Sequence, residues 1–328
     1  TRIYDSERLP FTLTPRQYDK GVNQYIPYYD RNLPDYVELK DIIDFIADDS
    51  DRSKLPLQSG DKINYIPTKK LKITIDSAAV VDNGIVPPEL ADQIVPEIKW
   101  TIKQSALYKN DLMFLDFLAT SHWDRPIYFA NPSSMSKVFN VDKFCHMEGF
   151  VYRFMPVKAK EFITGIGGVS SGASYDILMN KCEWGNLNDP TVTIDRESYR
   201  NSRMPKQNFL RLAQALINEN KKDSAILVLD RCLEAFPPEK FHFDLLMLPF
   251  AEAYYAAGSL EKGNELVQRM FGLYSDDLRY YFSLDPLFAD TYYKEQVQQA
   301  FGVIQRLGQI AKENGQTELG NNIDSTLM

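Results

Sequence analysis

The chain has 328 residues, of which 44% are hydrophobic and 25% are charged. These globular values exclude a largely disordered or low-complexity protein, and the length favours two domains over a single core. The net charge of −8 and the pI near 5.1 argue against a nucleic-acid partner, because phosphate binding needs clustered lysine and arginine.

Nothing in the sequence predicts a membrane span. No window of 18 apolar residues exists, and the most apolar stretch, residues 112–119, is interrupted by Asp116. The chain begins at Thr1 without a charged segment followed by an apolar one, so we expect a processed protein or a piece of a longer one.

The first part of the chain mixes extended and helical patterns. Prolines and tyrosines over residues 1–30 predict an extended segment that lies on a surface. Apolar residues at helical spacing over 37–46 predict a short amphipathic helix. Alternation over 62–67 and 70–76 predicts two strands, which we expect to form a hairpin.

Helix and strand patterns continue through the next part. The segment 96–119 is typical of a helix, with Asn110 as a cap for its later half. Strands are predicted over 127–130 and 150–154, where aromatic and β-branched residues gather. The intermixed elements indicate an α+β domain over residues 1–160.

Residues 161–204 change in composition and contain several glycines and serines. The stretch 165–172 is glycine-rich, but it has neither a Gly-Lys-Ser/Thr ending nor the GxGxxG spacing of a phosphate loop. We therefore predict a linker region over 161–204, followed by a helical domain over 205–328.

Two helical hairpins of the tetratricopeptide type are predicted in this last domain. Such hairpins place small residues where two helices touch, a turn residue between the helices and often a proline after the second helix. In the first hairpin these positions are Ala213, Leu216, Asn220, Ala225, Leu229, Cys232 and Pro237. In the second they are Ala251, Tyr254, Gly258, Gly263, Val267 and Met270. Residues 295–314 continue the pattern and are expected to cap the array.

An array of helical hairpins presents a concave face to a ligand. From their positions in the two hairpins, Gln207, Gln214, Glu252 and Tyr255 are predicted to line this face. Any other pair of packed helical hairpins would show the same small-residue contacts, so that alternative stays open beside the tetratricopeptide-like one.

Residues suited to catalysis or metal binding are sparse. The histidines, His122, His146 and His242, lack the spacing of a metal site, so we predict no metal and no cofactor. His146 follows Cys145, but neighbours on a strand point to opposite faces, which disfavours a catalytic pair and leaves no predicted catalytic residue. The sequence leaves the disulfide state open for the three cysteines, Cys145, Cys182 and Cys232.

Several strings of residues, 116–129, 140–153, 175–186 and 251–255, together resemble a known family over most of the chain. They are similar to the C-terminal extracytoplasmic soluble region of bacterial multi-pass membrane proteins of the domain-of-unknown-function family 2723 type. The membrane core of that family is similar to GT-C glycosyltransferases of the protein O-mannosyltransferase type. The motif residues, to which we assign structural roles, are Trp123, Arg125, Pro126, Tyr128, Gly149, Tyr152, Arg153, Trp184 and Gly185.

The resemblance implies that transmembrane helices precede Thr1 in the full-length protein and tether this chain to the extracytoplasmic, periplasmic face of the inner membrane. It also implies that the catalytic carboxylate of a GT-C enzyme lies in the membrane part. No catalytic residue is therefore carried over to this chain.

These observations lead to the hypothesis of a non-catalytic accessory module that binds an acceptor polypeptide, a glycan or a partner subunit, and that is attached to its own membrane domain. One alternative is a free-standing hydrolase that uses His122 or His146 with nearby carboxylates. Another alternative is a purely structural spacer domain.

Overall fold

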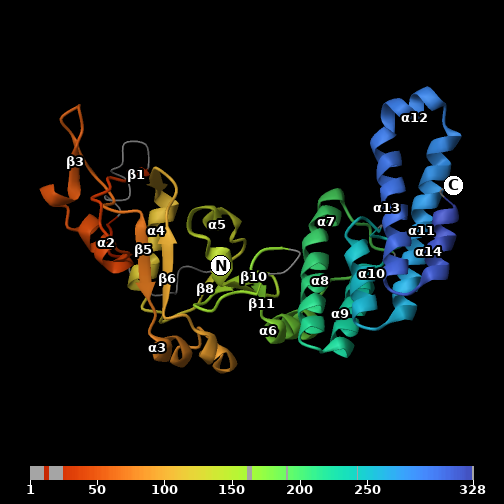
Figure 1. The fold of residues 1–328 in the computed structure, drawn as a ribbon, viewed down its shortest axis with the longest axis horizontal. Coiled ribbons are helices and arrows are strands. Elements are labelled where there is room, and N and C mark those ends of the chain that lie inside the picture. Colours follow the sequence, from red (N-terminus) through yellow and green to blue (C-terminus); the bar gives the residue numbers. More distant parts are fainter. Residues whose placement is uncertain (1–10, 15–24, 161–164, 190, 242, 327–328) are drawn as a thin grey trace. The chain divides into compact units, whose positions relative to one another are not determined.

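The computed structural model describes residues 11–14, 25–160, 165–189, 191–241 and 243–326. The chain forms two compact units, Thr1–Gly168 and Val169–Met328 (Figure 1). Strands and short helices alternate in the first unit and the second is helical, which confirms the predicted α+β domain followed by an all-α domain. The extended segment predicted for residues 1–30 lies mostly outside the described residues.

The first unit is built from short elements. Its strands are β1 (Tyr25–Pro27), β2 (Val37–Glu38), β3 (Lys54–Pro56), β4 (Lys62–Asn64), β5 (Lys70–Thr74), β6 (Glu97–Thr101), β7 (Ala106–Tyr108), β8 (Ile127–Phe129), β9 (Cys145–Glu148), β10 (Val151–Phe154) and β11 (Gly168–Val169), whose second residue already belongs to the second unit. Its helices are α2 (Leu39–Ala47), α3 (Ser77–Asp82), α4 (Lys109–Thr120) and α5 (Ser133–Phe139), with 3₁₀ turns η2 (Asp51–Ser53), η3 (Pro88–Gln93) and η4 (Val141–Phe144).

The described strands form four small sheets. In the largest, the order is β11-β9-β10-β8, and β10 runs antiparallel to both β8 and β9. A second sheet has the order β2-β5-β6, with β5 parallel to β2 and antiparallel to β6. The pairs β1-β7 and β3-β4 complete the set.

Helices α2 and α4 and the larger sheets share one hydrophobic core. The buried stripe of α2 consists of Leu39, Ile42, Ile43 and Ile46, which confirms the amphipathic helix predicted there. Aromatic rings fill the space beside α4, where Phe114 lies 5.5 Å from the ring of Phe129 and 5.7 Å from the ring of Phe139. The first unit therefore has a core of its own.

The hairpin predicted between the strands over 62–67 and 70–76 is wrong, although both strands exist. β4 pairs with β3 instead, and β5 lies between β2 and β6. Both backbone groups of Ile66, which follows β4, already form hydrogen bonds. Its N–H donates to the Pro27 carbonyl at 2.9 Å, and its carbonyl accepts from the Tyr29 N–H at 3.0 Å. The chain cannot turn directly from β4 into β5 while these bonds hold.

The helix predicted over 96–119 is wrong in its first half. Residues 97–101 form β6, in which Ile98 and Trp100 are buried and Lys99 is exposed. Buried side chains therefore recur at every second position, as in a strand. The later half is helical, as predicted, but Asp111 rather than Asn110 caps it. The Asp111 carboxylate accepts a hydrogen bond from the Tyr108 N–H at 3.1 Å.

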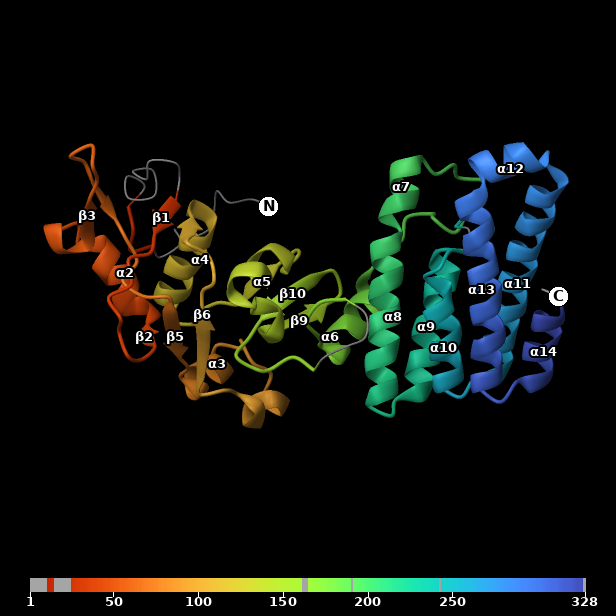
Figure 2. The same cartoon turned by 45° about the horizontal axis from the view of Figure 1, so that its top comes forward.

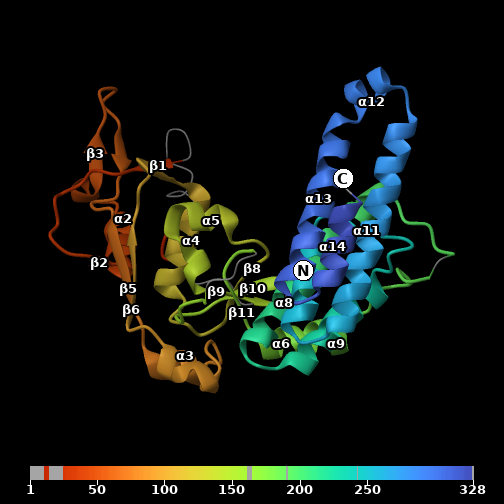
Figure 3. The ribbon, with the colours of Figure 1, turned by 45° about the vertical axis from the view of Figure 1, so that its right-hand side comes forward.

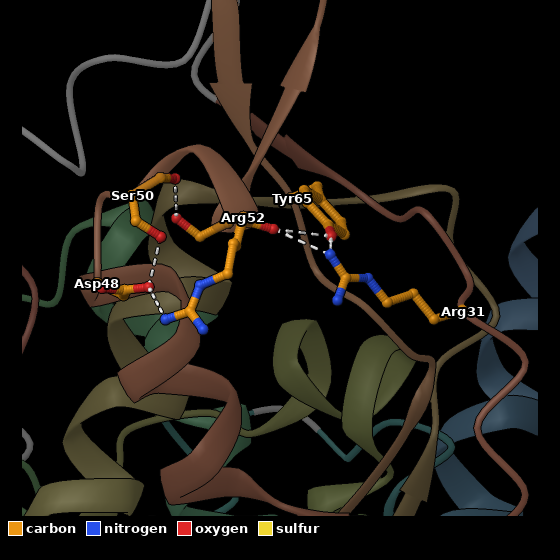
Figure 4. A network of polar contacts seen from close by, with 6 residues as sticks. Arg31, Asp48, Ser50, Arg52 and Tyr65 are labelled. Carbon is orange, nitrogen blue, oxygen red and sulfur yellow. Dashed lines mark hydrogen bonds and ion pairs between the residues drawn. The ribbon is translucent and has the colours of Figure 1, made fainter.

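A polar network ties the segment before β2 to the turn before β3 (Figure 4). The Arg31 guanidinium lies 5.2 Å from the ring centres of Phe45 and Tyr65, and it donates to the Arg52 carbonyl at 2.9 Å. Tyr65 accepts a further hydrogen bond from Arg31 and donates to the same carbonyl at 3.2 Å. This network anchors the loop between α2 and β3 and gives the Tyr65 hydroxyl both a donor and an acceptor.

The second unit contains only helices among its described residues after β11. They are α6 (Ser171–Tyr175), the π-helical segment η5 (Asp176–Lys181), α7 (Arg196–Asn201), α8 (Arg203–Asn218), α9 (Lys222–Ala235), α10 (Met247–Ala256), α11 (Leu260–Ser283), α12 (Pro286–Tyr292), α13 (Lys294–Glu313) and α14 (Thr317–Ser325). Residues 161–204, predicted as a linker region, thus include α6, η5, α7 and the start of α8. No helix in the described parts of the chain combines the length and apolar character needed to cross a bilayer.

Helices α8 to α14 form antiparallel hairpins, α8–α9, α10–α11 and α13–α14 (Figures 2 and 3). Each hairpin turns at a residue with positive φ: Asn220 at 59°, Gly258 at 90° and Gly315 at 77°. The same backbone hydrogen bond closes each turn, from Lys221 to Leu216, from Ser259 to Tyr254 and from Gln316 to Ala311, at 2.8, 2.9 and 2.8 Å. This is the Schellman arrangement that ends a helix at a left-handed residue.

The segment predicted to cap the array is the first helix of a third hairpin. Gly308 on α13 and Gly320 on α14 are twelve residues apart, as are Ala213 and Ala225 in the first hairpin. A Cβ atom on Gly320 would lie 2.8 Å from the Gly308 carbonyl oxygen, so the two helices touch through their backbones. The small-residue spacing of the repeat therefore continues into the last helix.

Candidate interaction site

Of the four residues predicted to line a concave face, Tyr255 is buried. Its side chain is only 5% exposed and fills the notch left by Gly263, where an added Cβ would lie 2.5 Å from the Tyr255 ring. Its hydroxyl donates to Asn264 Oδ1 at 2.7 Å, and burial raises the pKa of Tyr255 to about 12. Tyr255 thus packs the α10–α11 hairpin together.

The other three predicted residues are half-buried. Glu252 on α10 forms an ion pair with Arg306 on α13, and Arg306 also contacts Glu313 at 3.4 Å. Gln207 and Gln214 lie on α8. The structure thus joins Glu252 to α13 and Tyr255 to α11, and a role for these residues in ligand binding stays a prediction.

The spacing of the hairpins reveals an insertion. The turn residues Asn220 and Gly258 are 38 residues apart, whereas Gly258 and Gly315 are 57 apart. The added length falls in the end of α11, in α12 and in the start of α13, and we name residues 274–297 the extension. In each view α12 lies at the far end of α11 and α13, beyond α14 (Figures 1 and 3).

The extension carries a group of large side chains that are exposed to solvent. The most exposed are Phe282, Leu287 and Tyr292, at 65%, 77% and 64%. Together with two neighbours they form what we name the aromatic tip: Tyr280, Phe282, Leu287, Phe288 and Tyr292. Exposed apolar groups gathered in one place typically mark an interaction site, because their contact with water is unfavourable.

The aromatic tip is held in place by ring packing and by a helix cap. Tyr281 on α11 stacks on Tyr293 beside α13, with ring centres 5.0 Å apart. The Asp285 carboxylate caps α12 by accepting from the N–H groups of Leu287 and Phe288, at 3.0 and 3.1 Å. The exposed side chains therefore project from a folded support.

The family motif residues of the first unit form a second group. Glu148 on β9 is buried and accepts a hydrogen bond from the Tyr128 hydroxyl at 3.1 Å, and its carboxylate lies 3.4 Å from Arg153 Nε. Arg153 also donates to the Tyr128 hydroxyl at 3.0 and 2.7 Å, and to the Gly84 carbonyl at 3.4 Å. This cluster joins the three strands β8, β9 and β10.

Other motif residues have roles in packing or in turns. Trp123 is buried and stacks on Phe154 at 5.8 Å, with a positive φ of 58° at the turn before β8. Gly149 has a φ of 66° between β9 and β10, and Gly185 has a φ of 51°. Trp184 packs on Phe209 and Phe236 of the second unit. The rest are half-buried or exposed side chains beside β8 and on β10: Arg125, Pro126 and Tyr152.

The two histidines of the hydrolase alternative lie in different environments. His122 is exposed in the turn after α4, with a φ of 46°. His146 is buried on β9, where its Nε2 lies 3.0 Å from the Val157 carbonyl and burial lowers its pKa. Burial raises the pKa of the adjacent Cys145 to about 12, so this thiol stays protonated and is a poor nucleophile. His242 lies outside the described residues.

Fold and surface together define a protein with an α+β domain and a helical-hairpin domain that exposes an aromatic tip. The chain belongs to the family of TMEM260-associated domain 2, which matches residues 1–171. No curated protein and no solved structure shows significant similarity to it.

Sequence reasoning missed the aromatic tip. The signal was present in the run Tyr280-Tyr281-Phe282, which places rings on different sides of a helix, and in Phe288 and the pair Tyr292-Tyr293 that follow. Rings on all sides of a helix cannot all face one core, so some had to be exposed or to meet a partner.

Proposed function

We propose that the chain is a non-catalytic accessory module of a glycosyltransferase-like membrane protein, and that its helical unit binds a protein partner through the aromatic tip. The observation that carries the proposal is the exposure of Phe282, Leu287 and Tyr292 on the ordered extension. Burial of one such side chain contributes about 1.5–3 kcal/mol. A partner that covers the tip would gain this free energy several times over.

The finer assignment rests on the family resemblance. The similarity of residues 116–129 and 140–153 to soluble regions of multi-pass membrane proteins supports a membrane part of the GT-C type in the parent protein. The match to TMEM260-associated domain 2 is compatible with an accessory domain. Under this proposal the chain lies on the extracytoplasmic side. The partner at the tip is then the membrane part of the same protein, or the polypeptide acceptor that this part modifies.

The test compares two double variants of the chain. Phe282→Ser with Leu287→Ser removes the most exposed members of the tip, and Leu227→Ser with Leu260→Ser removes two exposed leucines from α9 and α11 outside the extension. Binding is measured to the purified membrane part of the parent protein and to its acceptor polypeptide. The tip variant should lose about 3 kcal/mol, or about a hundredfold in affinity.

The control variant should bind as the unchanged chain does. Equal affinity of the tip variant, the control variant and the unchanged chain would contradict the proposal. A complete lack of binding by the unchanged chain to either partner would also contradict it, and would favour the spacer alternative.

A further inference from the structure

A cleft lies between α11 and α13 on the side of Phe243. It has a volume of about 370 Å³, within the range of small-ligand sites. Four of its lining residues, Tyr274, Asp277, Tyr281 and Gln296, belong to the extension, so the cleft exists because α11 and α13 continue beyond the repeat. Figure 2 shows these two helices side by side.

The lining combines aromatic rings with hydrogen-bonding groups. Phe243 and Tyr274 are buried and contribute ring surface, and Tyr281 is a half-buried ring between this cleft and the apolar hollow beside α12. Polar groups come from Asp277 on α11 and from the amides of Gln296 and Gln299 on α13. Within the described chain, neither the Asp277 carboxylate nor the Gln296 amide takes part in a hydrogen bond, so both can bind a ligand.

The Tyr274 hydroxyl at the cleft is protonated near neutral pH. Burial raises the pKa of Tyr274, with the charges of Asp244 and Asp277 adding to the shift, so its hydroxyl keeps its proton. The Gln299 amide, which also lines the cleft, partly opposes this rise in the pKa of Tyr274. The cleft thus offers a carboxylate that only accepts, and amides that both donate and accept.

The charge of the lining selects the ligand. Asp277 is the single charged residue that lines the cleft, and no lysine or arginine joins it among the described residues. A phosphate, sulfate or uronic acid would therefore meet repulsion without compensation. A neutral ligand that offers many hydroxyl donors and acceptors, together with flat C–H faces, matches the carboxylate, the two amides and the rings.

From this combination we propose that the α11–α13 cleft is a binding site for a neutral carbohydrate, with Asp277, Gln296 and Gln299 binding hydroxyl groups and Tyr274 and Tyr281 contacting the sugar ring. The inference deepens the proposed interaction function and rests on it for the biological role. A lysine-bearing peptide is the competing ligand, because a single carboxylate also suits a cation.

The experiment measures binding of the whole chain to neutral trisaccharides, namely maltotriose, cellotriose, mannotriose and N-acetylchitotriose, by saturation-transfer NMR and calorimetry. Asp277→Asn and Gln299→Leu should each weaken the binding of the sugar that binds best by about tenfold or more. The matched control is Asp276→Asn, which removes the neighbouring carboxylate that pairs with Arg279 outside the cleft. It should leave sugar affinity unchanged.

Three results would overturn the inference. They are the absence of binding by all four sugars, equal affinity of the cleft variants and the control, and tight binding of a tri-lysine peptide in place of the sugars. The variant with Phe282→Ser and Leu287→Ser separates the two proposals, because it should retain sugar binding while it loses the protein partner. Binding of the protein partner by the unchanged chain, without binding of any of the four sugars, would refute the carbohydrate site alone.

Discussion

Replacement of Gly263 by alanine tests the packing of the second hairpin. Gly263 lies on α11 against the ring of Tyr255 on α10, where an added Cβ would lie 2.5, 2.7 and 2.8 Å from three ring carbons. Carbon atoms in favourable contact are separated by about 3.5–4.0 Å. The ring cannot move freely, because its hydroxyl donates to Asn264 at 2.7 Å and the side chain is buried.

The magnitude follows from two opposing effects. Alanine in a helix is favoured over glycine by about 1 kcal/mol, whereas overpacking of a core costs about 1–3 kcal/mol. Gly272 on the same helix supplies the control, since an added Cβ there meets nothing within 4 Å. Gly272→Ala should stabilise the unit by up to about 1 kcal/mol, and Gly263→Ala should be less stable than Gly272→Ala by about 1–3 kcal/mol.

Urea and thermal unfolding of both variants would measure this difference. For a unit of this size, about 1 kcal/mol corresponds to a shift of about 2–4 °C in Tm. Smaller side chains at position 255 should relieve the overlap, so Gly263→Ala should become neutral or stabilising when combined with Tyr255→Ala. If Gly263→Ala proves as stable as Gly272→Ala in the unchanged background, the contact between α10 and α11 described above is wrong.

Three further predictions concern other positions. Asn220 has a left-handed backbone at the first turn, so Asn220→Ala should lower the free energy of unfolding by about 1 kcal/mol and Asn220→Gly should not, as measured by urea denaturation. The cysteines are free, and a maleimide should label half-buried Cys182 in the native chain while buried Cys145 and Cys232 react only after unfolding, as mass spectrometry would show. Burial holds the pKa of His146 below its unfolded value of 6.5, so only the unfolded state gains a proton as the pH falls through 6.5. Stability of the first unit should therefore decline below this pH, and His146→Gln should remove that part of the decline in chemical denaturation.

The sequence was sufficient to predict the helical hairpins because their constraints are local. Asn220 and Gly258 lie at the two predicted turns, where a left-handed backbone ends a helix, and Ala213 and Ala225 are buried as expected of small contact residues. The first unit was harder, because strand pairing depends on distant partners. Nothing near Ile66 in the sequence shows that its backbone groups bond to residues 27–29.

The candidate site depends on distances that periodicity does not reveal. Tyr255 was assigned to an open face from its position in the repeat, but Gly263 leaves a notch that draws the ring inside the hairpin. The aromatic tip exists because α11 is longer than α9, its counterpart in the first hairpin. The apolar pattern of a helix locates its end only to within a few residues. The cleft beside the tip forms because α11 and α13 pack side by side although α12 separates them in the sequence. This packing is a tertiary contact that helix periodicity does not predict.

Site-specific photo-crosslinking in the full-length protein tests the central claim most directly. A photoreactive phenylalanine analogue in place of Leu287, which is 77% exposed on the tip, is compared with the same analogue in place of Leu227, which is 53% exposed on α9. The account predicts a crosslink from position 287 to the membrane part of the parent protein or to its acceptor, and none from position 227. No crosslink from position 287 to either partner, or equal crosslinking from both positions, would contradict it.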